Sequence, residues 1–201
     1  MTIAVAIYLF KNVEVLDFAG PFEVFTTASR VFLKHNPDKP APFNVFTVAK
    51  TSAPVQARAG LKTLPDFSMD DGPRIDLLVI PGGIVDEELQ DEQVIDWVRA
   101  TSSSAQMTAS VCTGAFLLAK AGLLDGQQAT THWEDIADLR SQFPQVWVQE
   151  GVRWVDEGAV VTSAGIAAGI DMSLHLVARL ASKELAIATA RQMDVPYRAE
   201  A

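Results

Sequence analysis

The sequence predicts an α/β protein with a mostly parallel sheet that carries helices on both faces. Apolar runs of strand length alternate along the chain with patterns of helical period, which is typical of such a sheet. The composition, 49% hydrophobic and 20% charged residues, is that of a globular protein. A chain of 201 residues suffices for one substantial core and is too short for two ordinary domains, so we expect residues 1–201 to form a single domain.

The first predicted strand covers residues 3–9, an apolar run near the start of the chain. It carries no basic leader and no small-residue cleavage site, and it is too short to span a bilayer, so we interpret it as a buried strand. A helix over 20–33 is predicted next, because Pro21 suits a first helical turn, where its missing N–H has no partner. A second strand over 43–48 and a hairpin over 55–64 around Ala59-Gly60 follow.

The clearest core strand covers residues 76–80 and ends at Pro81-Gly82-Gly83. The helix predicted after it, over 87–100, has its apolar residues roughly on one face. The alternation then continues to the end of the chain. The further predicted elements are a strand over 107–111, a helix over 113–121 that ends at Gly122, a helix over 133–143, a hairpin with strands over 152–155 and 159–162, and closing helices over 170–180 and 183–193.

The charge and cysteine content limit the partners of the protein. The formal net charge is −9 and the sequence pI is near 4.7, so phosphate backbones and anionic lipids are repelled and we expect neither nucleic acid nor membrane as a partner. A single cysteine forms no internal disulfide, and we expect a cytoplasmic protein. No two of the three histidines have metal-ligand spacing, so neither a metal nor another cofactor is expected.

The turn Ser110-Val111-Cys112-Thr113-Gly114 is the strongest candidate site. Ligands of parallel sheets gather at the carboxyl ends of the strands, and Cys112 follows such an end immediately before a helix. Small residues on both sides permit the sharp bend of a nucleophile elbow. The first turn of the helix is expected to lower the pKa of the thiol. The alternative is a small buried side chain without chemistry, which is the usual role of a free cysteine.

Two segments are expected beside this turn. Asp17 is predicted in the loop after the first strand, either as a proton partner of the thiol or as a helix N-cap. Gly82 and Gly83 end a neighbouring strand, and they either aim backbone N–H groups into an oxyanion hole or simply form a turn. Thr113 offers its N–H to the same hole and its hydroxyl to a substrate or a water molecule.

His132 and Ile166 are further candidates for the pocket. His132 is either a partly buried histidine with a satisfied backbone bond or a base near the thiol. The segment from Gly165 to Asp171 lacks the spacing of a phosphate or dinucleotide loop. We interpret it as a tight turn that places Ile166 in a pocket beside Cys112.

Five motifs, in this order, carry a family resemblance: Val13-Glu14-Val15-Leu16-Asp17-Phe18-Ala19-Gly20-Pro21, Ile80-Pro81-Gly82-Gly83, Ser110-Val111-Cys112-Thr113-Gly114, Ala129-Thr130-Thr131-His132-Trp133 and Thr162-Ser163-Ala164-Gly165-Ile166-Ala167-Ala168-Gly169-Ile170-Asp171. Together they resemble the ThiJ/PfpI superfamily, which is related in fold to class I glutamine amidotransferases. They are most similar to its branch of isonitrile hydratases and N-terminal domains of AraC-type regulators.

The resemblance implies a flavodoxin-like three-layer sandwich and a homodimer with the site near its interface. It implies a strained elbow at Cys112, continued by Thr113 and Gly114, with Asp17 as the partner of the thiol. Gly82 and Gly83 fall on the oxyanion side. PfpI-type proteases carry histidine where this chain has Thr113, and the hydratases carry threonine where it has Ala167. The regulators continue into a DNA-binding helix-turn-helix domain, and we expect none here because the sequence reaches Ala201 without one.

The resemblance implies an isonitrile hydratase-like hydro-lyase that uses a cysteine nucleophile and turns a small-molecule isonitrile into an N-substituted formamide. One alternative is a ligand- or redox-sensing module related to the regulators, in which the thiol binds or is oxidised without turnover. Another is an amidase or glyoxalase-like enzyme for small carbonyl compounds, which would use the same nucleophile.

Overall fold

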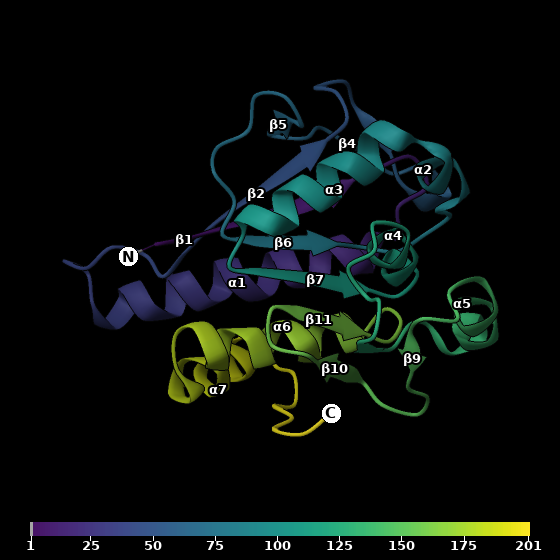
Figure 1. Cartoon of the computed structure of the whole chain (residues 1–201). Coiled ribbons are helices and arrows are strands. Elements are labelled where there is room, and N and C mark those ends of the chain that lie inside the picture. Colours follow the sequence, from purple (N-terminus) through teal and green to yellow (C-terminus); the bar gives the residue numbers. More distant parts are fainter. Residues whose placement is uncertain (1) are drawn as a thin grey trace.

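The computed structural model describes residues 2–201 and is built around one seven-stranded sheet (Figure 1). The strands lie in the order β10-β11-β7-β6-β1-β2-β5. All neighbouring pairs are parallel except β10 with β11, which form the predicted C-terminal hairpin. The bounds are β1 Ile3–Leu9, β2 Phe43–Ala49, β5 Phe67–Ser68, β6 Leu77–Ile80, β7 Met107–Val111, β10 Trp154–Asp156 and β11 Val160–Ser163.

Two small two-stranded sheets lie outside the main one. β3 (Val55–Gln56) and β4 (Lys62–Thr63) pair antiparallel around the 3-10 turn η1 (Arg58–Gly60), which confirms the predicted hairpin. β8 (Gln128–Ala129) and β9 (Trp147–Val148) pair parallel.

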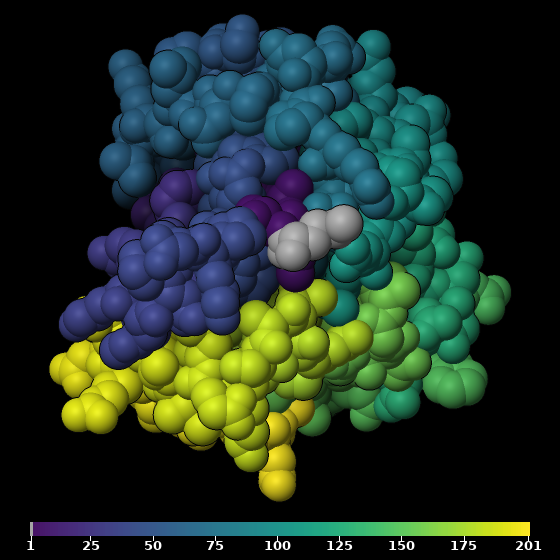
Figure 2. Space-filling view, turned by 90° about the vertical axis from the view of Figure 1, so that its left-hand side faces the viewer, coloured from purple at the N-terminus to yellow at the C-terminus, as the bar shows by residue number. Residues whose placement is uncertain are grey.

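Helices cover both faces of the sheet, which confirms the predicted fold class. Helices α1, α6 and α7 pack on one face, and α2 to α5 pack on the other (Figure 1). At the amino-terminal end of the strands, α7 lies directly against α1 (Figure 2). The bounds are α1 Val15–His35, α2 Asp86–Gln90, α3 Glu92–Ser104, α4 Gly114–Lys120, the 3-10 turn η2 Trp133–Asp135, α5 Ile136–Gln142, α6 Ala168–Leu180 and α7 Lys183–Gln192.

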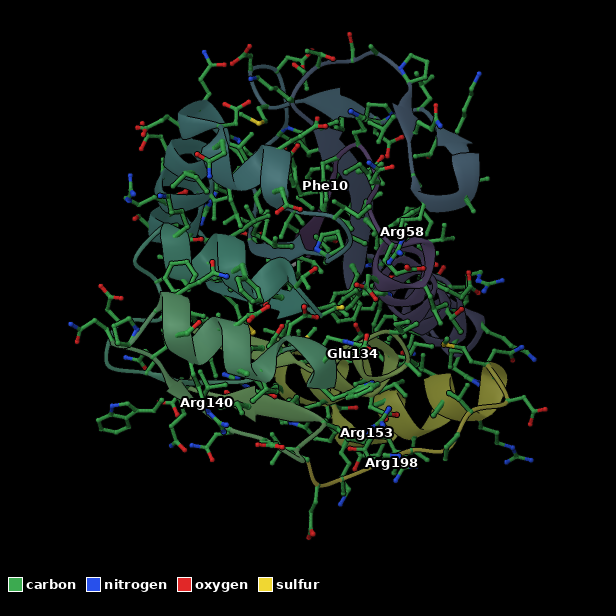
Figure 3. All side chains as sticks on the ribbon, turned by 90° about the vertical axis from the view of Figure 1, so that its right-hand side faces the viewer. Phe10, Arg58, Glu134, Arg140, Arg153 and Arg198 are labelled. Carbon is green, nitrogen blue, oxygen red and sulfur yellow. The ribbon has the colours of Figure 1, made fainter. Side chains whose placement is uncertain are left out.

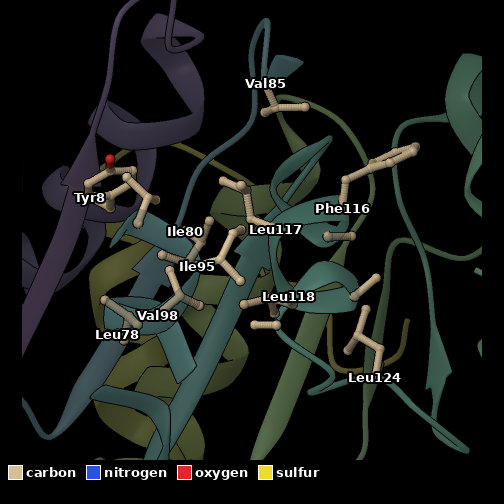
Figure 4. Packing of buried hydrophobic residues seen from close by; sticks show 14 of the residues in the cluster. Tyr8, Leu78, Ile80, Val85, Ile95, Val98, Phe116, Leu117, Leu118 and Leu124 are labelled. Carbon is tan, nitrogen blue, oxygen red and sulfur yellow. The ribbon is translucent and has the colours of Figure 1, made fainter. Parts of the chain in front are cut away.

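The core consists of two apolar layers that the sheet separates. In β1, Val5 and Ile7 face α1, whereas Ala6 and Tyr8 face α3 and α4, because successive side chains of a strand point to opposite faces. All four are fully buried. The layer beneath α3 and α4 is dense with leucine, isoleucine and valine (Figure 4). The central strands are therefore held on both sides, which fixes the position of the turns at their carboxyl ends.

The predicted start of the first helix is wrong. α1 begins at Val15, not at Gly20, and Pro21 lies inside it. A proline at this position removes the N–H that would bond to the carbonyl of Asp17, four residues earlier. The helix continues because its apolar residues pack on the sheet and on α6 and α7.

The single helix predicted over 87–100 is two helices. α2 ends at Gln90 and α3 begins at Glu92, since the carboxylate of Asp91 accepts a hydrogen bond from the N–H of Gln93 and caps the second helix. No helix within residues 2–201 is both long and apolar enough to cross a lipid bilayer.

Candidate active site

Cys112 lies at the carboxyl end of β7, where the strand turns into α4. Its backbone φ is +56°, in the left-handed region that residues other than glycine rarely adopt. Figure 3 views the molecule from this end of the sheet, with Arg58 above and Glu134 below the middle of the face. The predicted strand-to-helix position of the cysteine is confirmed, and its backbone has the strained geometry of an elbow.

Three contacts hold this strained turn. The N–H of Cys112 donates to the carbonyl of Ser163 (3.1 Å), and the hydroxyl of Thr131 donates to the carbonyl of Cys112 (2.8 Å). A Cβ at Gly114 would lie 2.2 Å from the carbonyl oxygen of Ile80, so only glycine lets α4 start this close to β6. The neighbouring strands and the β8 segment therefore fix the thiol in place.

Asp17 lies in the first turn of α1 and not in a loop, which corrects the sequence prediction. It is also not the N-cap, because Glu14 holds that position and accepts from the N–H of Val15. The Asp17 side chain is fully buried. The N–H of Gly82 donates to its Oδ2 (3.1 Å), while its Oδ1 has no hydrogen-bond partner within residues 2–201.

Burial raises the pKa of Asp17 from 3.8 to about 7, while the N–H of Gly82 lowers it and the charge of Glu14 raises it further. The thiol of Cys112 is close enough to interact directly with this carboxyl group. A carboxyl group that titrates near neutral pH is suited to accepting and returning a proton.

The expected low pKa of the thiol is wrong. Burial raises the pKa of Cys112 to about 12, the charge of Asp17 adds to the effect, and the N–H of Thr113 opposes it. The helix that follows is only seven residues long, so its terminus does not compensate for the lost hydration. The thiol therefore holds its proton at neutral pH and needs a base during reaction.

The hydrogen bonds of the glycine turn differ from those expected. The N–H of Gly82 bonds to Asp17, and the N–H of Gly83 donates to the hydroxyl of Thr113 (2.9 Å). This hydroxyl in turn donates to the carbonyl of Gly83 (2.9 Å). The Thr113 hydroxyl thus joins the elbow to the β6 loop instead of facing a substrate. The N–H of Thr113 is directed at the thiol, where it can also donate to a developing negative charge.

A pocket of about 330 Å³ opens in front of the thiol. Cys112, Thr113, Gly83, His132 and Ile166 line it as expected, whereas Gly82 and Gly114, which were also expected there, do not. Glu14, Arg58, Glu134 and Asp135 complete the lining, and sequence reasoning did not single them out.

His132 and Ile166 hold their places through close backbone packing. A Cβ at Gly165 would lie 2.0 Å from the His132 ring, so glycine at that position leaves room for the imidazole. The Nδ1 of His132 lies 3.4 Å from an Asp135 carboxylate oxygen, which orients the ring. Ile166 has φ +54° and is 39% exposed, so it forms a projecting edge of the pocket.

Other residues that contact the elbow could not be recognised from the sequence. Thr131 contributes only its hydroxyl and Ser163 only its backbone carbonyl, and both residue types are common at strand ends. Arg58 comes from the β3–β4 hairpin, and its ion pair with Glu14 (3.4 Å) brings a distant segment to the pocket. Within residues 2–201, no group of three His, Cys, Asp or Glu side chains is arranged to hold a metal ion.

Comparison with known proteins supports the resemblance. A model of the DJ-1/PfpI family matches residues 3–179. The isonitrile hydratase of Pseudomonas putida is 33% identical over 195 residues, which are 96% of this chain and 79% of that protein. The HTH-type transcriptional regulator GbdR of Pseudomonas aeruginosa is 32% identical over 142 residues, 71% of this chain, and the match spans only 38% of the regulator.

Solved structures give the same result for the fold. A ThiJ/PfpI family protein from Pseudomonas syringae is 26% identical with a TM-score of 0.84, over 99% of this chain and 78% of that one. Drosophila melanogaster DJ-1beta has a TM-score of 0.81 over 98% of this chain and all of that one, and at 21% identity it supports the fold alone. The flavodoxin-like sandwich that the resemblance implied is confirmed.

Proposed function

The chain belongs to the DJ-1/PfpI family, and on that basis we propose that it is a cysteine-dependent hydro-lyase that hydrates isonitriles to N-substituted formamides. The observation that carries the proposal is the pairing of a strained, pocket-lining thiol with a buried carboxyl group that titrates near pH 7. The similarity to an isonitrile hydratase over nearly the whole chain supports this choice of substrate.

The proposed reaction starts with the addition of the thiol. The carboxylate of Asp17 accepts the proton of Cys112 as Sγ bonds to the terminal carbon of the isonitrile. The carboxyl group then returns this proton to that carbon, which leaves a thioimidate on the enzyme. A pKa near 7 keeps both forms of Asp17 populated at neutral pH, as a group with two opposite proton transfers requires.

Hydrolysis of the thioimidate completes the cycle. Asp17, again ionised, accepts a proton from water as the water oxygen bonds to the thioimidate carbon, and it passes this proton to the substrate nitrogen. As the C–S bond breaks, the remaining hydroxyl proton passes through Asp17 to the sulfur, so that the formamide leaves and the thiol of Cys112 is restored. The N–H of Thr113, which is directed at the thiol, stabilises the charge that develops on the substrate.

Turnover of a panel of isonitriles tests the proposal, with the formyl proton of the product followed by NMR. We expect formamide from the wild type and none from Cys112→Ser or Asp17→Asn. Asp125→Asn, which alters an exposed aspartate outside the pocket lining, should keep wild-type turnover. Incorporation of one ¹⁸O from labelled water into the formamide supports hydrolysis of the thioimidate. An unaltered rate in Cys112→Ser would overturn the mechanism.

A ligand-binding module without turnover is the competing function, and the likeness to GbdR favours it. In that case an isonitrile or another small molecule binds the pocket and no formamide forms. Calorimetric titration of the wild type with the same panel separates the two functions. Saturable binding without product supports the sensing module and contradicts the hydro-lyase.

We also propose that two copies of the chain associate beside the site. Four exposed large apolar side chains line the pocket or lie within two residues of its lining in the sequence, with exposures from 38% to 75%: Leu16, Ile84, Trp133 and Ile166. Exposed apolar side chains of this kind are stabilised by contact with a second surface. Sedimentation of the wild type should give twice the 21.7 kDa mass, and Leu16→Glu should sediment as a monomer. A monomeric wild type at tens of micromolar contradicts this association.

A further inference from the structure

A second hollow opens beside the pocket of Cys112 and shares a wall with it. It measures about 260 Å³, and Gly83, Thr113 and Asp135 line both spaces. The two spaces therefore lie side by side, and we refer to them together as the depression; the reactive group lies in only one of them. We propose, on the basis of the function proposed above, that this second hollow binds the non-reacting part of the substrate and selects a chain that ends in a cation.

The inner part of the second hollow is apolar. Phe116 of α4, which is 5% exposed, and Leu89 of α2 line it, and Val85 adds a third apolar side chain. Burial of methylene groups against such a wall is favourable because it removes apolar surface from water. The wall therefore suits an alkyl segment that extends away from the thiol.

The outer part of the same hollow is acidic. Asp86 comes from the first turn of α2 and Asp138 from α5, so two separate helices bring carboxylates to one small space. Neither carboxylate forms an ion pair with any residue among 2–201. Two unpaired carboxylates at the end of an apolar wall attract a positive group and repel a negative one.

The charged residues of the Cys112 pocket also favour a positive group over a negative one. Arg58 is the one lysine or arginine among the lining residues, and its guanidinium is 3.4 Å from Glu14. Glu134 and Asp135 lie across the pocket, with the imidazole of His132 between 3.4 and 3.7 Å from their carboxylates. The acidic groups outnumber the basic ones in both halves, so an anionic substrate is disfavoured along the whole depression.

The test uses Cys112, the only cysteine, as a reporter that needs no turnover. Three methanethiosulfonates with a six-carbon arm are compared: hexyl, 6-aminohexyl and 5-carboxypentyl. The Cys112 sulfur attacks the sulfenyl sulfur, a disulfide forms, methanesulfinate leaves and the thiol proton passes to solvent. The labelling rate is measured by mass spectrometry for the wild type and two double variants. Asp86→Asn/Asp138→Asn alters the hollow, and Asp70→Asn/Asp125→Asn removes two exposed charges elsewhere.

We expect the ammonium reagent to label fastest and the carboxylate reagent slowest. The ratio of these two rates should fall about five-fold in Asp86→Asn/Asp138→Asn and in high salt, and should stay unchanged in the control variant. A ratio of one or less in the wild type overturns the inference, and so does an equal ratio in all three proteins.

The outcome is separable from that of the proposed function. A protein that labels in the expected order but makes no formamide lacks the hydratase activity and keeps the cation-selective hollow. A protein that hydrates ammonium-, methyl- and carboxylate-ended isonitriles equally well keeps the activity and lacks the selectivity.

Discussion

Replacement of Asp17 by asparagine should make the folded protein more stable at alkaline pH. The pKa of the carboxyl group is about 7 in the folded protein and 3.8 when it is fully hydrated, a difference of about three units. Each unit corresponds to ~1.4 kcal/mol, so ionisation of the buried group costs up to ~4 kcal/mol of stability. Asparagine imitates the protonated carboxyl group, because its oxygen still accepts from Gly82 while its amide replaces the unpartnered oxygen.

The pH at which this cost appears follows from the raised pKa. Below pH 3.8 the group is protonated in both the folded and the unfolded chain, and its titration contributes nothing to the pH dependence. As the pH rises toward 7, the unfolded chain loses this proton first, and the wild type is progressively destabilised. Above pH 7 the full cost of ~4 kcal/mol is present. Asp17→Asn has no such titration.

Urea unfolding at a series of pH values from 4 to 8 measures the effect. The difference in unfolding free energy between Asp17→Asn and the wild type should rise with pH by up to ~4 kcal/mol. The pair is compared again in the Cys112→Ser background, where the thiol no longer contributes. A stability difference that is constant from pH 4 to pH 8 would refute the raised pKa of Asp17. A variant that loses stability relative to the wild type as the pH rises would show that folding lowers this pKa instead.

Two further substitutions test the geometry of the elbow. Gly114→Ala should destabilise the protein by ~1–3 kcal/mol, because its Cβ would lie 2.2 Å from the carbonyl oxygen of Ile80. Gly72→Ala should leave the urea midpoint nearly unchanged, because its Cβ would lie 3.5 Å from its nearest neighbour, the carbonyl oxygen of Ser68. Equal midpoints for the two alanine variants would contradict the close approach. Thr131→Val should cost ~1 kcal/mol in urea unfolding, because the carbonyl of Cys112 loses its 2.8 Å donor, and a variant as stable as the wild type would show that this bond does not hold the turn.

Most of the sheet was predictable because its strands are buried on both faces. The run at residues 3–9 is apolar throughout, those at 43–48 and 107–111 are mostly apolar with two polar residues each, and each of the three is a strand in the structure. β5 was missed because it has only two residues, Phe67 and Ser68, which are too few for a period to be recognised. Short edge strands depend on the neighbour that they pair with, here β2.

Most residues of the candidate site could be predicted from the sequence, but their burial and their pKa values could not. The strand-to-helix position of Cys112 follows from local sequence, and the pocket contains Gly83, His132 and Ile166 as expected, but neither Gly82 nor Gly114. The helix start at Val15, the burial of Asp17 and the resulting pKa of the thiol depend on packing against segments 65 and 95 residues away in the chain. No local pattern reports how much water those segments exclude. The orientation of the N–H groups of Gly82 and Gly83 depends on the same distant partners.

Thr113 and Gly83 form two hydrogen bonds with each other, which join the reactive turn to the β6 loop. These two bonded segments form one structural unit. The outer walls of the depression come instead from α2 and α5, short helices whose residues at this opening are largely exposed. Mutations can therefore accumulate in those two helices without disturbing the thiol, while almost any change within the unit displaces it. Because the thiol and the outer walls are held by different segments, ligand specificity can change during evolution, or catalysis can give way to binding alone, with little loss of stability.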